Sequence, residues 1–362
     1  MSYNDIRRIS KCVKIKDKSI GGKSDILIQS MTNTDTENAI DTIEQIKALE
    51  SVGCDIVRIT VPTLSSVETV RQIKKSDIKI PVVADIHFDY KIALECVKAG
   101  IDKIRINPGN IGDEWKIREV AVACKSAGVP IRIGVNSGSL EKHILSKYGS
   151  PTPEALAESA FYHAELLEKF GFDDIIISVK SSDVLNMIQT NRILAKSSNY
   201  PIHLGVTEAG DSYSGLVKSS IGIGSLLCDG IGDTIRVSLT ADPLEEIRAG
   251  KELLSSLGFY SKGGIKIVSC PTCGRTKINL IELSERFKNA TNDFDTNGKT
   301  IKVALMGCVV NGPGEAKECD IGIAGGKGEA VLFKNGKIIK KIPENQVIEA
   351  LLYELEKIRD RN

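Results

Sequence analysis

Three cysteines near the carboxyl-terminal end of the chain stand at spacings that suit a metal or iron–sulfur centre. Cys270 and Cys273 form a C-x-x-C pair in SCPTCGRT, and Cys308 lies in the glycine-rich segment MGCVVNGPGEA. Redox dithiols, zinc sites and iron–sulfur sites share the C-x-x-C spacing. The pair comes late in the chain, which argues against a thioredoxin-like dithiol. The Gly-Pro-Gly turn at 312–314 lets the backbone pass close to a bulky group such as an inorganic cluster.

Two ligand sets are compatible with these cysteines. Four thiolates, with Cys319 as the fourth, would suit structural zinc or a closed cluster. Three thiolates and Glu315 would leave one iron with a displaceable oxygen ligand, because a carboxylate is a hard ligand among soft thiolates. The spacing alone slightly favours four cysteines, since Glu315 also suits an ordinary surface position.

A second group of polar residues lies at the ends of apolar, β-branched segments in the first 260 residues. Several are two positions apart, so both side chains of such a pair point to the same face of a strand. Four arginines and a lysine among them need an explanation, because a buried charge is costly unless it is paired. The residues are Arg58, Thr60, Asp85, His87, Arg105, Asn107, Arg132, Asn136, Ser178, Lys180, Glu208, Arg236 and Ser238.

These cations have two interpretations. In the structural one, each arginine meets a carboxylate in a buried network, but the evident acids at strand ends are Asp85 and Glu208. In the functional one, the cations bind a polyanion, because arginine matches phosphate oxygens with paired hydrogen bonds. Each charged hydrogen bond contributes about 1.5–3 kcal/mol. The scarcity of acids favours a pocket for a phosphorylated small molecule, most of all a diphosphate.

The elements that must position these residues alternate between strand and helix. Eight apolar runs, each followed by an amphipathic run, predict parallel strands joined by helical crossovers. Eight such units in about 235 residues match a closed (β/α)8 barrel, whose chemistry lies at the carboxyl ends of its strands. A doubly wound open sheet is the alternative, but no GxGxxG follows the first strand. The expected strands are 26–30, 55–61, 80–86, 103–107, 131–135, 174–180, 202–206 and 234–239. The expected helices are 36–52, 64–75, 89–99, 113–127, 152–170, 182–197, 213–228 and 243–257.

The polar segment 136–153 interrupts the fifth unit and is expected to be an active-site loop or a surface insertion. After residue 260 the regular alternation ends, which predicts a small α+β domain. Asn335-Gly336 between its last two strands is a strong hairpin signal. The expected strands there are 264–268, 301–306, 320–324, 329–333 and 337–341, and the expected helices are 276–290 and 344–359.

The composition limits the class of protein. The chain has 48 basic and 47 acidic residues and a net charge of +1, which argues against a nucleic-acid or membrane-surface binder. Hydrophobic residues make up 41% and charged residues 26%, as in globular proteins with a sizeable core. We expect no signal peptide and no transmembrane helix. The nine cysteines are an odd number, which favours reduced thiols and a cytoplasmic location.

The motifs resemble those of the 4-hydroxy-3-methylbut-2-enyl diphosphate synthase family, which acts in the methylerythritol phosphate route to isoprenoids. CPTCGRT and MGCVVNGPGEA follow RITVP, ADIHFDY, KIRINPGNIG, IRIGVNSGSL and HLGVTEAG in the order typical of that family, over nearly the whole chain. The resemblance is to the short bacterial form, which lacks a middle domain.

The resemblance implies two domains and one cofactor. Residues 1–260 would form a TIM barrel that binds the substrate. Residues 261–362 would form an α+β domain, similar to sulfite reductase and ferredoxin-like folds, that carries one [4Fe–4S] cluster. The implied cluster ligands are Cys270, Cys273, Cys308 and Glu315, which leaves Cys319 without a cluster role.

The resemblance also implies the reaction and its partners. The substrate would be 2-C-methyl-D-erythritol 2,4-cyclodiphosphate, reduced by two electrons from a ferredoxin or flavodoxin. The chain would form a head-to-tail homodimer. The residues expected to bind the diphosphate are Arg58, Arg105, Arg132, Lys180, Arg236 and Ser238. Those expected near the carbon skeleton are Asp85, His87, Asn136 and Glu208, and Glu208 and Glu315 are the expected catalytic carboxylates.

Two other functions compete with this one. A phosphate- or pterin-binding barrel transferase with a structural zinc domain would give a colourless protein without labile sulfide. A non-catalytic iron–sulfur sensor or scaffold would not need five basic residues at strand ends.

Overall fold

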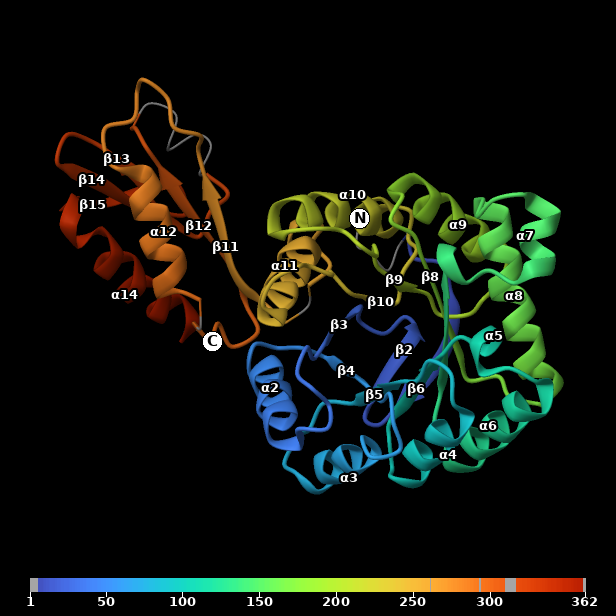
Figure 1. The fold of residues 1–362 in the computed structure, drawn as a ribbon. Coiled ribbons are helices and arrows are strands. Elements are labelled where there is room, and N and C mark those ends of the chain that lie inside the picture. The colour runs from blue at the N-terminus through green and yellow to red at the C-terminus, as the bar shows by residue number, and fades with distance from the viewer. Residues whose placement is uncertain (1–5, 261, 293, 310–316, 361–362) are drawn as a thin grey trace. The chain divides into compact units, whose positions relative to one another are not determined.

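The computed structural model describes residues 6–260, 262–292, 294–309 and 317–360 of the 362-residue chain. The chain divides into two compact units, residues 1–259 and 260–362. Figure 1 shows the first unit as a ring of helices around strands and the second as a small sheet with helices.

The first unit is a closed barrel of eight parallel strands, which confirms the expected fold class. Its strands neighbour one another in the order β8-β7-β6-β5-β4-β3-β10-β9, and a parallel bridge between Ile177 and Ile202 closes the ring. The strands are β3 (Leu27–Met31), β4 (Ile56–Thr60), β5 (Val82–Asp85), β6 (Lys103–Ile106), β7 (Ile131–Asn136), β8 (Ile175–Lys180), β9 (His203–Leu204) and β10 (Thr234–Ile235).

The last two strands are shorter than the sequence predicted. We expected 202–206 and 234–239, whereas β9 and β10 have two residues each. Beyond β10, the backbone N–H of Leu239 donates to the side chain of Glu246 instead of a neighbouring strand.

Each strand is followed by a helix that covers the outside of the barrel (Figure 1). Side chains of Asp89, Asp183, Asp211 and Asp242 accept backbone N–H groups where four of these helices begin. The helices are α2 (Ala39–Ser51), α3 (Val67–Lys75), α4 (Tyr90–Lys98), α6 (Glu114–Ala127), α8 (Pro153–Lys169), α9 (Val184–Ser197), α10 (Ser212–Cys228) and α11 (Pro243–Ser256).

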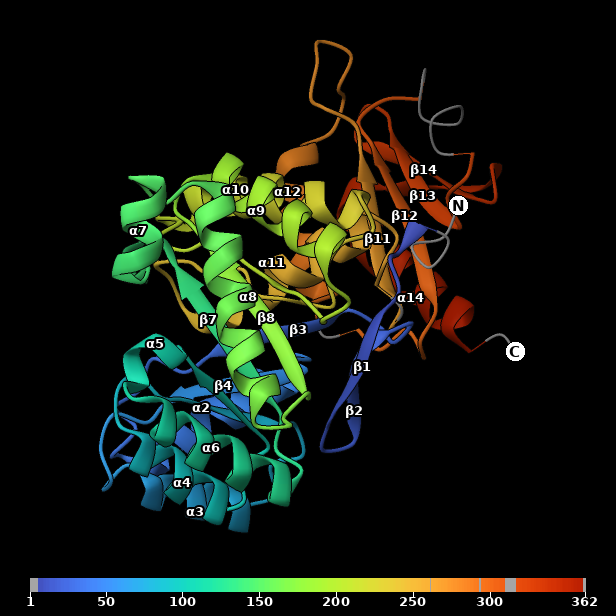
Figure 2. The ribbon, with the colours of Figure 1, turned by 90° about the vertical axis from the view of Figure 1, so that its right-hand side faces the viewer.

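An amino-terminal hairpin, which the sequence analysis missed, closes one end of the barrel. Its strands β1 (Ser10–Ile15) and β2 (Lys18–Gly22) are antiparallel and lie side by side in Figure 2. Val13, Ile15 and Ile20 of the hairpin pack in one buried apolar cluster with residues of four barrel strands. The hairpin therefore excludes water from the end of the barrel opposite the strands' carboxyl ends.

The segment 136–153 is more regular than a loop. It contains a 3-10 turn at Ser137–Ser139 and the helix α7 (Lys142–Tyr148) before α8 begins. Ile144 is fully buried, and this single apolar anchor holds the otherwise polar helix against the barrel. A further short helix, α5 (Pro108–Ile111), follows β6 and was not predicted.

The second unit is a five-stranded sheet in the order β11-β12-β13-β14-β15. Its strands are β11 (Gly264–Ser269), β12 (Thr300–Met306), β13 (Ile321–Gly325), β14 (Glu329–Lys334) and β15 (Lys337–Pro343). The first three are parallel, and the last two are antiparallel to their neighbours. Asn335 and Gly336 both have positive φ angles, 48° and 73°, as the predicted hairpin turn requires.

Two helices, α12 (Leu280–Ala290) and α14 (Val347–Arg359), share an apolar core with this sheet. The helix α12 begins four residues later than expected, because the side chain of Asn279 caps it by accepting the N–H of Glu282. The residues between β11 and Asn279, which include the C-x-x-C pair, are instead irregular, with a turn at 274–275.

Asp233 fastens the amino-terminal segment to the barrel, and its removal should destabilise the first unit. Its Oδ1 accepts from Arg7 at 2.5 Å and from Ser10 Oγ at 2.8 Å, and its Oδ2 accepts the N–H of Ile202 at 2.8 Å. Asp233→Ala should lower the free energy of unfolding by about 3–5 kcal/mol, because Arg7 loses a buried counter-charge. The chain has one tryptophan, Trp115 in α6, so its fluorescence in a urea titration reports on this unit.

Asp229→Ala is the matched control. Asp229 pairs with Arg192 at 2.8 Å, but both side chains are exposed. An exposed ion pair contributes less than about 1 kcal/mol to the free energy of unfolding, so this substitution should have little effect. Equal effects of the two substitutions would contradict an anchoring role for Asp233.

Candidate active site

A polar cavity of about 170 Å³ opens at the carboxyl ends of the barrel strands. It contains every residue that the sequence analysis expected to bind substrate, except Glu208. Its lining residues are Arg58, Asp85, His87, Arg105, Arg132, Gly134, Asn136, Ser178, Lys180, Thr207, Arg236 and Ser238. The structure thus brings together residues from five strands, β4 to β8, and from the segments that follow β5, β9 and β10.

Asp85 orients two of the arginines. Its Oδ1 accepts from Arg105 Nη1 at 3.0 Å, and its Oδ2 lies 3.4 Å from Arg58 Nε. Burial raises the pKa of Asp85, but Arg58 and Arg105 lower it more and hold it at about 2. Burial lowers the pKa of Arg58 to about 10, against the opposing effect of Asp85. Asp85 is therefore ionised and serves as the counter-charge of both guanidinium groups.

Glu246 holds a third arginine and was missed by the sequence analysis. Its two oxygens accept from Arg236 Nε and Nη2, both at 3.2 Å. It also accepts from Ser30 Oγ at 2.8 Å and from the N–H of Leu239 at 3.2 Å. Glu246 lies in the first turn of α11, where an acidic residue is ordinarily explained by the helix dipole alone. The sequence therefore gave no sign that it faces the barrel.

Arg132 and Lys180 are different, because neither forms an ion pair with any described carboxylate. Arg132 is 1% exposed, and its Nη1 lies 3.4 Å from the side-chain oxygen of Gln29. Burial, together with Arg236 and other cations, holds the pKa of Lys180 well below its usual value. The structural interpretation therefore holds for Arg58, Arg105 and Arg236, which meet carboxylates. For Arg132 and Lys180, which have no carboxylate partner among the described residues, binding of a polyanion stays a prediction.

Small and soft residues make room for these cations. A Cβ atom at Gly134 would collide with the guanidinium of Arg105. A Cβ atom at Gly205 would lie 2.8 Å from Lys180 Nζ and 2.8 Å from the carbonyl oxygen of Arg236. Met31 Sδ accepts from Arg58 Nη2 at 2.8 Å. Glycine is thus required at two points where a charged side chain lies against a strand.

Three of the residues singled out from the sequence do not line the cavity. Glu208 is exposed, with a positive φ of 52°, and its neighbour Thr207 lines the cavity instead. The side chain of Asn107 accepts the N–H of Gly109 at 3.1 Å and begins α5. Thr60 ends β4 outside the cavity. A catalytic role for Glu208 stays a prediction.

The cysteines of the second unit follow adjacent parallel strands. Ser269 of β11 pairs with Leu305 of β12, so Cys270 and Cys308 leave the sheet at the same edge. The N–H of Gly307 donates to Cys270 Sγ at 3.3 Å. Thr276 Oγ1 accepts the N–H of Cys273 at 3.1 Å, and Cys273 is exposed.

The described residues do not bring three or more cysteine, histidine or acidic side chains together as metal ligands. The predicted ligand Glu315 lies in segment 310–316, outside the described residues. The full ligand set therefore stays a prediction.

Cys319 has the properties of a core residue. It is 4% exposed and packs with Ala304, Met306, Ala324 and Phe333. Burial raises the pKa of its thiol. A thiol in apolar surroundings is a poor metal ligand, because the thiolate is the form that binds metal. Its burial favours the ligand set without Cys319.

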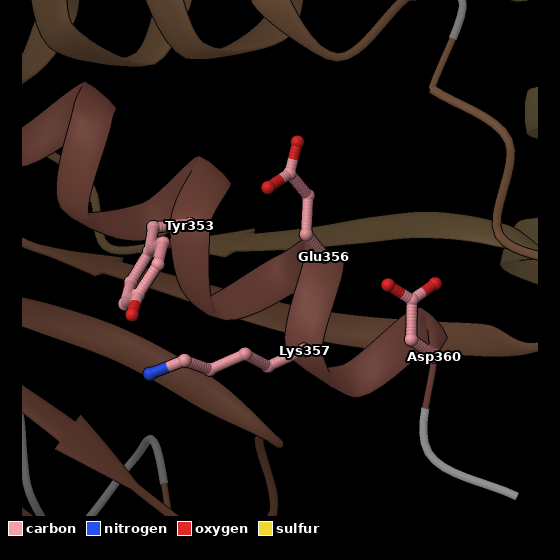
Figure 3. Close-up of a pocket in the computed structure, with 4 residues that line it drawn as sticks. All are labelled: Tyr353, Glu356, Lys357 and Asp360. Carbon is pink, nitrogen blue, oxygen red and sulfur yellow. The ribbon is translucent and has the colours of Figure 1, made fainter.

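A second hollow lies on the outer face of α14. Figure 3 shows Tyr353, Glu356, Lys357 and Asp360 extending from this one helix. All four are exposed, and Lys357 Nζ lies 3.9 Å from the centre of the Tyr353 ring. The side chains do not converge on a common point, so this surface is a weaker candidate for a ligand site than the barrel cavity.

Every helix in the described ranges is too short or too polar to cross a lipid bilayer.

Replacing Asp85 tests the charge balance of the cavity. Asp85→Asn should lower the free energy of unfolding by about 3–5 kcal/mol at neutral pH, because Arg58 and Arg105 lose their buried counter-charge. The pKa of Asp85 is about 2, below its ordinary 3.8. The stability difference between parent and variant should therefore be largest above about pH 4, and it should shrink by about 2 kcal/mol as the pH falls through 2. Urea titrations of parent and variant at several pH values measure this difference.

Inorganic pyrophosphate supplies an independent measurement for the same variant. Since the anion replaces the missing carboxylate, it should raise the melting temperature of Asp85→Asn more than that of the parent. An equal rise in both proteins would contradict the assignment of Asp85 as the counter-charge.

The comparisons with known proteins agree with this architecture. Residues 10–251 match the GcpE TIM-barrel domain, and residues 266–357 match the GcpE protein C-terminal domain. The barrel also resembles dihydropteroate synthase from Thermus thermophilus, with a TM-score of 0.51 and 13% identity, over 68% of this chain and 98% of that one. For dihydropteroate synthase from Stenotrophomonas maltophilia the TM-score is 0.50 and the identity 14%, over 69% of this chain and 97% of that one. At these identities the likeness shows the barrel fold alone.

Sequence relatives match nearly the whole chain. A protein from Clostridium tetani is 55% identical over 346 residues, which is 96% of this chain and 98% of that protein. One from Geobacter sulfurreducens is 52% identical over 346 residues, 96% and 97% of the two chains. Both are named 4-hydroxy-3-methylbut-2-en-1-yl diphosphate synthase (flavodoxin). With both domains matched in order and more than half of the residues shared, the chain belongs to the GcpE family.

Proposed function

We propose that this protein catalyses the reductive ring opening of 2-C-methyl-D-erythritol 2,4-cyclodiphosphate to 4-hydroxy-3-methylbut-2-enyl diphosphate. The reaction consumes two electrons and two protons and releases water. The observation that carries the proposal is a polar cavity in which basic side chains outnumber carboxylates, and in which Arg132 and Lys180 have no carboxylate partner among the described residues. The names of the relatives give the same product and specify flavodoxin.

The cavity residues explain how the diphosphate is held during the reaction. Arg58 and Arg105 are fixed by Asp85, and Arg236 is fixed by Glu246, so their guanidinium groups are oriented before the ligand arrives. Breaking the ring C–O bond adds a negative charge to the diphosphate. Preoriented cations in a water-poor site therefore bind the opening ring more strongly than the intact one, which lowers the barrier.

The second unit offers donors that fit an iron–sulfur cluster. Cys270 and Cys308 end adjacent strands, and the Gly307 N–H that donates to Cys270 Sγ is the kind of hydrogen bond that tunes cluster sulfurs. We assign Cys270, Cys273, Cys308 and Glu315 as ligands of a [4Fe–4S] cluster, which supplies the two electrons when bound. Residues 1–260 then form the substrate domain and residues 261–362 the cluster domain.

The assigned partners follow from the family. The relatives' names specify flavodoxin, so we assign a flavodoxin-type electron donor to this chain. The head-to-tail homodimer implied by the family resemblance stays a prediction. Glu208 stays a predicted catalytic carboxylate, as a proton donor to the departing hydroxyl or as a hydrogen-bond partner of the substrate.

Arg132 provides a direct test of the cavity. Arg132→Met should weaken binding of the cyclic diphosphate roughly 10- to 100-fold, because a charged hydrogen bond contributes about 1.5–3 kcal/mol. The fold should persist, since the variant removes a buried charge without adding volume. Anaerobic calorimetry with the oxidised protein measures binding, and product formation with reduced flavodoxin measures turnover. Arg118→Met, on the exposed face of α6, is the control and should match the parent. Normal binding by Arg132→Met would contradict the proposed pocket.

Three substitutions separate the two ligand sets. Cys308→Ser should lose iron, labile sulfide and activity together, because a thiolate ligand is removed. Glu315→Gln should keep the cluster and lose most activity, since three thiolates still hold it. Cys319→Ser should keep both, because Cys319 belongs to the apolar core. Iron and sulfide assays after anaerobic purification check all three. A bleached Cys319→Ser protein beside a fully active Glu315→Gln protein would restore the four-thiolate set.

A further inference from the structure

A ring of polar side chains lies inside the barrel, one layer beneath the cavity. Lys103 precedes Arg105 by two residues and therefore points to the same interior face of β6. His203 precedes Gly205 by two residues, and Thr234 precedes Arg236 by two. Because Gly205 and Arg236 face the interior of the barrel, His203 and Thr234 lie in the same layer as Lys103. All of these deeper side chains have 0% exposure. The apolar cluster of the amino-terminal hairpin closes the barrel below them.

Several polar atoms of this layer, and one of Arg132 directly above it, have no hydrogen-bond partner among the described residues. They are Lys103 Nζ, Gln29 Nε2, Arg132 Nε and His203 Nε2. His203 Nδ1 and Thr234 Oγ1 are 2.7 Å apart, and Arg132 Nη1 lies 3.4 Å from Gln29 Oε1. Lys103 is the exceptional member, because a fully buried ammonium group without a partner is among the costliest groups a protein can contain.

The charged groups around Lys103 make an ammonium form still less favourable. Arg132 on β7 and Arg58 on β4 are the charges that act on it, and both are positive. His203 on β9 faces the same interior, and cations hold its pKa well below its usual value, after the larger effect of burial. Asp85 on β5 pairs with Arg105 and Arg58 one layer higher.

Burial, with Arg132 and Arg58 adding to it, lowers the pKa of Lys103 well below its ordinary 10.5. Full burial, an Nζ without a hydrogen-bond partner among the described residues and two nearby guanidinium groups all favour the neutral amine over the ammonium form. Lys103 does not line the cavity, so it has no contact with a ligand there. Its only means of acting on a bound anion is its charge.

We propose that Lys103 takes up a proton when a diphosphate enters the cavity, so that binding is coupled to proton uptake and a positive charge forms beneath the anion. The entering phosphates neutralise the field of Arg132 and Arg58, and their own negative charge then favours the ammonium form. The proton comes from solvent, and no other bond changes. The inference rests on the proposed diphosphate ligand.

Calorimetry of the oxidised full-length protein with 2-C-methyl-D-erythritol 2,4-cyclodiphosphate, without reductant, tests this coupling. The cyclic diphosphate has no group that titrates near neutral pH, so protons exchanged on binding belong to the protein. Titrations in buffers of different ionisation enthalpy count those protons. The parent should take up about one more proton than Lys103→Met in the pH range where Lys103 changes its charge on binding.

The dependence of affinity on pH gives a second measurement. Because binding takes up a proton, the Kd of the parent should rise with pH, by about tenfold per unit between the two pKa values of Lys103. Lys103→Met should lack the part of this slope that Lys103 contributes. Lys103→Gln, also neutral at every pH, should behave as Lys103→Met and serves if the methionine variant does not fold. Lys98→Met is the matched control, since Lys98 is 70% exposed, and should behave as the parent.

The free protein provides a signature that a structural role would not produce. The pKa of Lys103 is lower in the fold than its ordinary 10.5 in the unfolded chain, because of burial and nearby cations, so its contribution makes stability rise with pH. Lys103→Met should therefore be more stable than the parent at pH 7, with the difference closing toward pH 10.

Three results would overturn the inference. One is equal proton uptake by the parent and Lys103→Met. Another is a Lys103→Met protein that is less stable than the parent at pH 7, which would make the amine a structural partner. Failure of the parent to bind the cyclic diphosphate at all would overturn the proposed function and this inference together.

Discussion

The shortage of counter-charge inside the barrel is the constraint on which the site depends. Five cations line a cavity that holds one carboxylate, Asp85, with a second, Glu246, reaching in from α11. Each carboxylate is shared or bidentate, so none is left for Arg132 and Lys180 among the described side chains. The fold tolerates this imbalance by lowering the pKa of buried amines and by surrounding guanidinium groups with neutral acceptors such as Met31 and Gln29. An anion is the group that completes the site.

The barrel produces this imbalance by separating its interior into layers. At the hairpin end, Ile15, Ile20 and Leu27 form a dry apolar layer. Above it lies the neutral polar layer of Lys103 and His203, and above that the charged cavity. Because the hairpin blocks solvent from below, a charge in the middle layer cannot be hydrated from that side. Exclusion of water from below keeps the local dielectric constant low, and a low dielectric constant strengthens the attraction between the cavity's cations and an anion.

Much of this arrangement could be predicted from the sequence, because strand periodicity repeats locally. Eight alternating units indicated the barrel, and spacing by two placed Arg58, Asp85 and Arg105 on its interior. What could not be predicted depends on contacts between distant segments. Glu246 resembles any acidic residue in a first helical turn until the fold turns it toward Arg236. Lys103 opens its strand, where a lysine is ordinarily exposed, and its burial follows from closure of the barrel around it.

The same imbalance bears on catalysis. An enzyme accelerates a reaction only through interactions that strengthen as the transition state forms. Ring opening of a cyclic diphosphate transfers negative charge onto an oxygen that was neutral in the ring. A cavity with a carboxylate for every cation would have less net positive charge and would favour the opened ring less. Arg132, Lys180 and a Lys103 that becomes charged as the anion binds respond instead to the added charge. The missing carboxylates, which destabilise the free protein, are therefore the feature that favours the opened ring over the closed one.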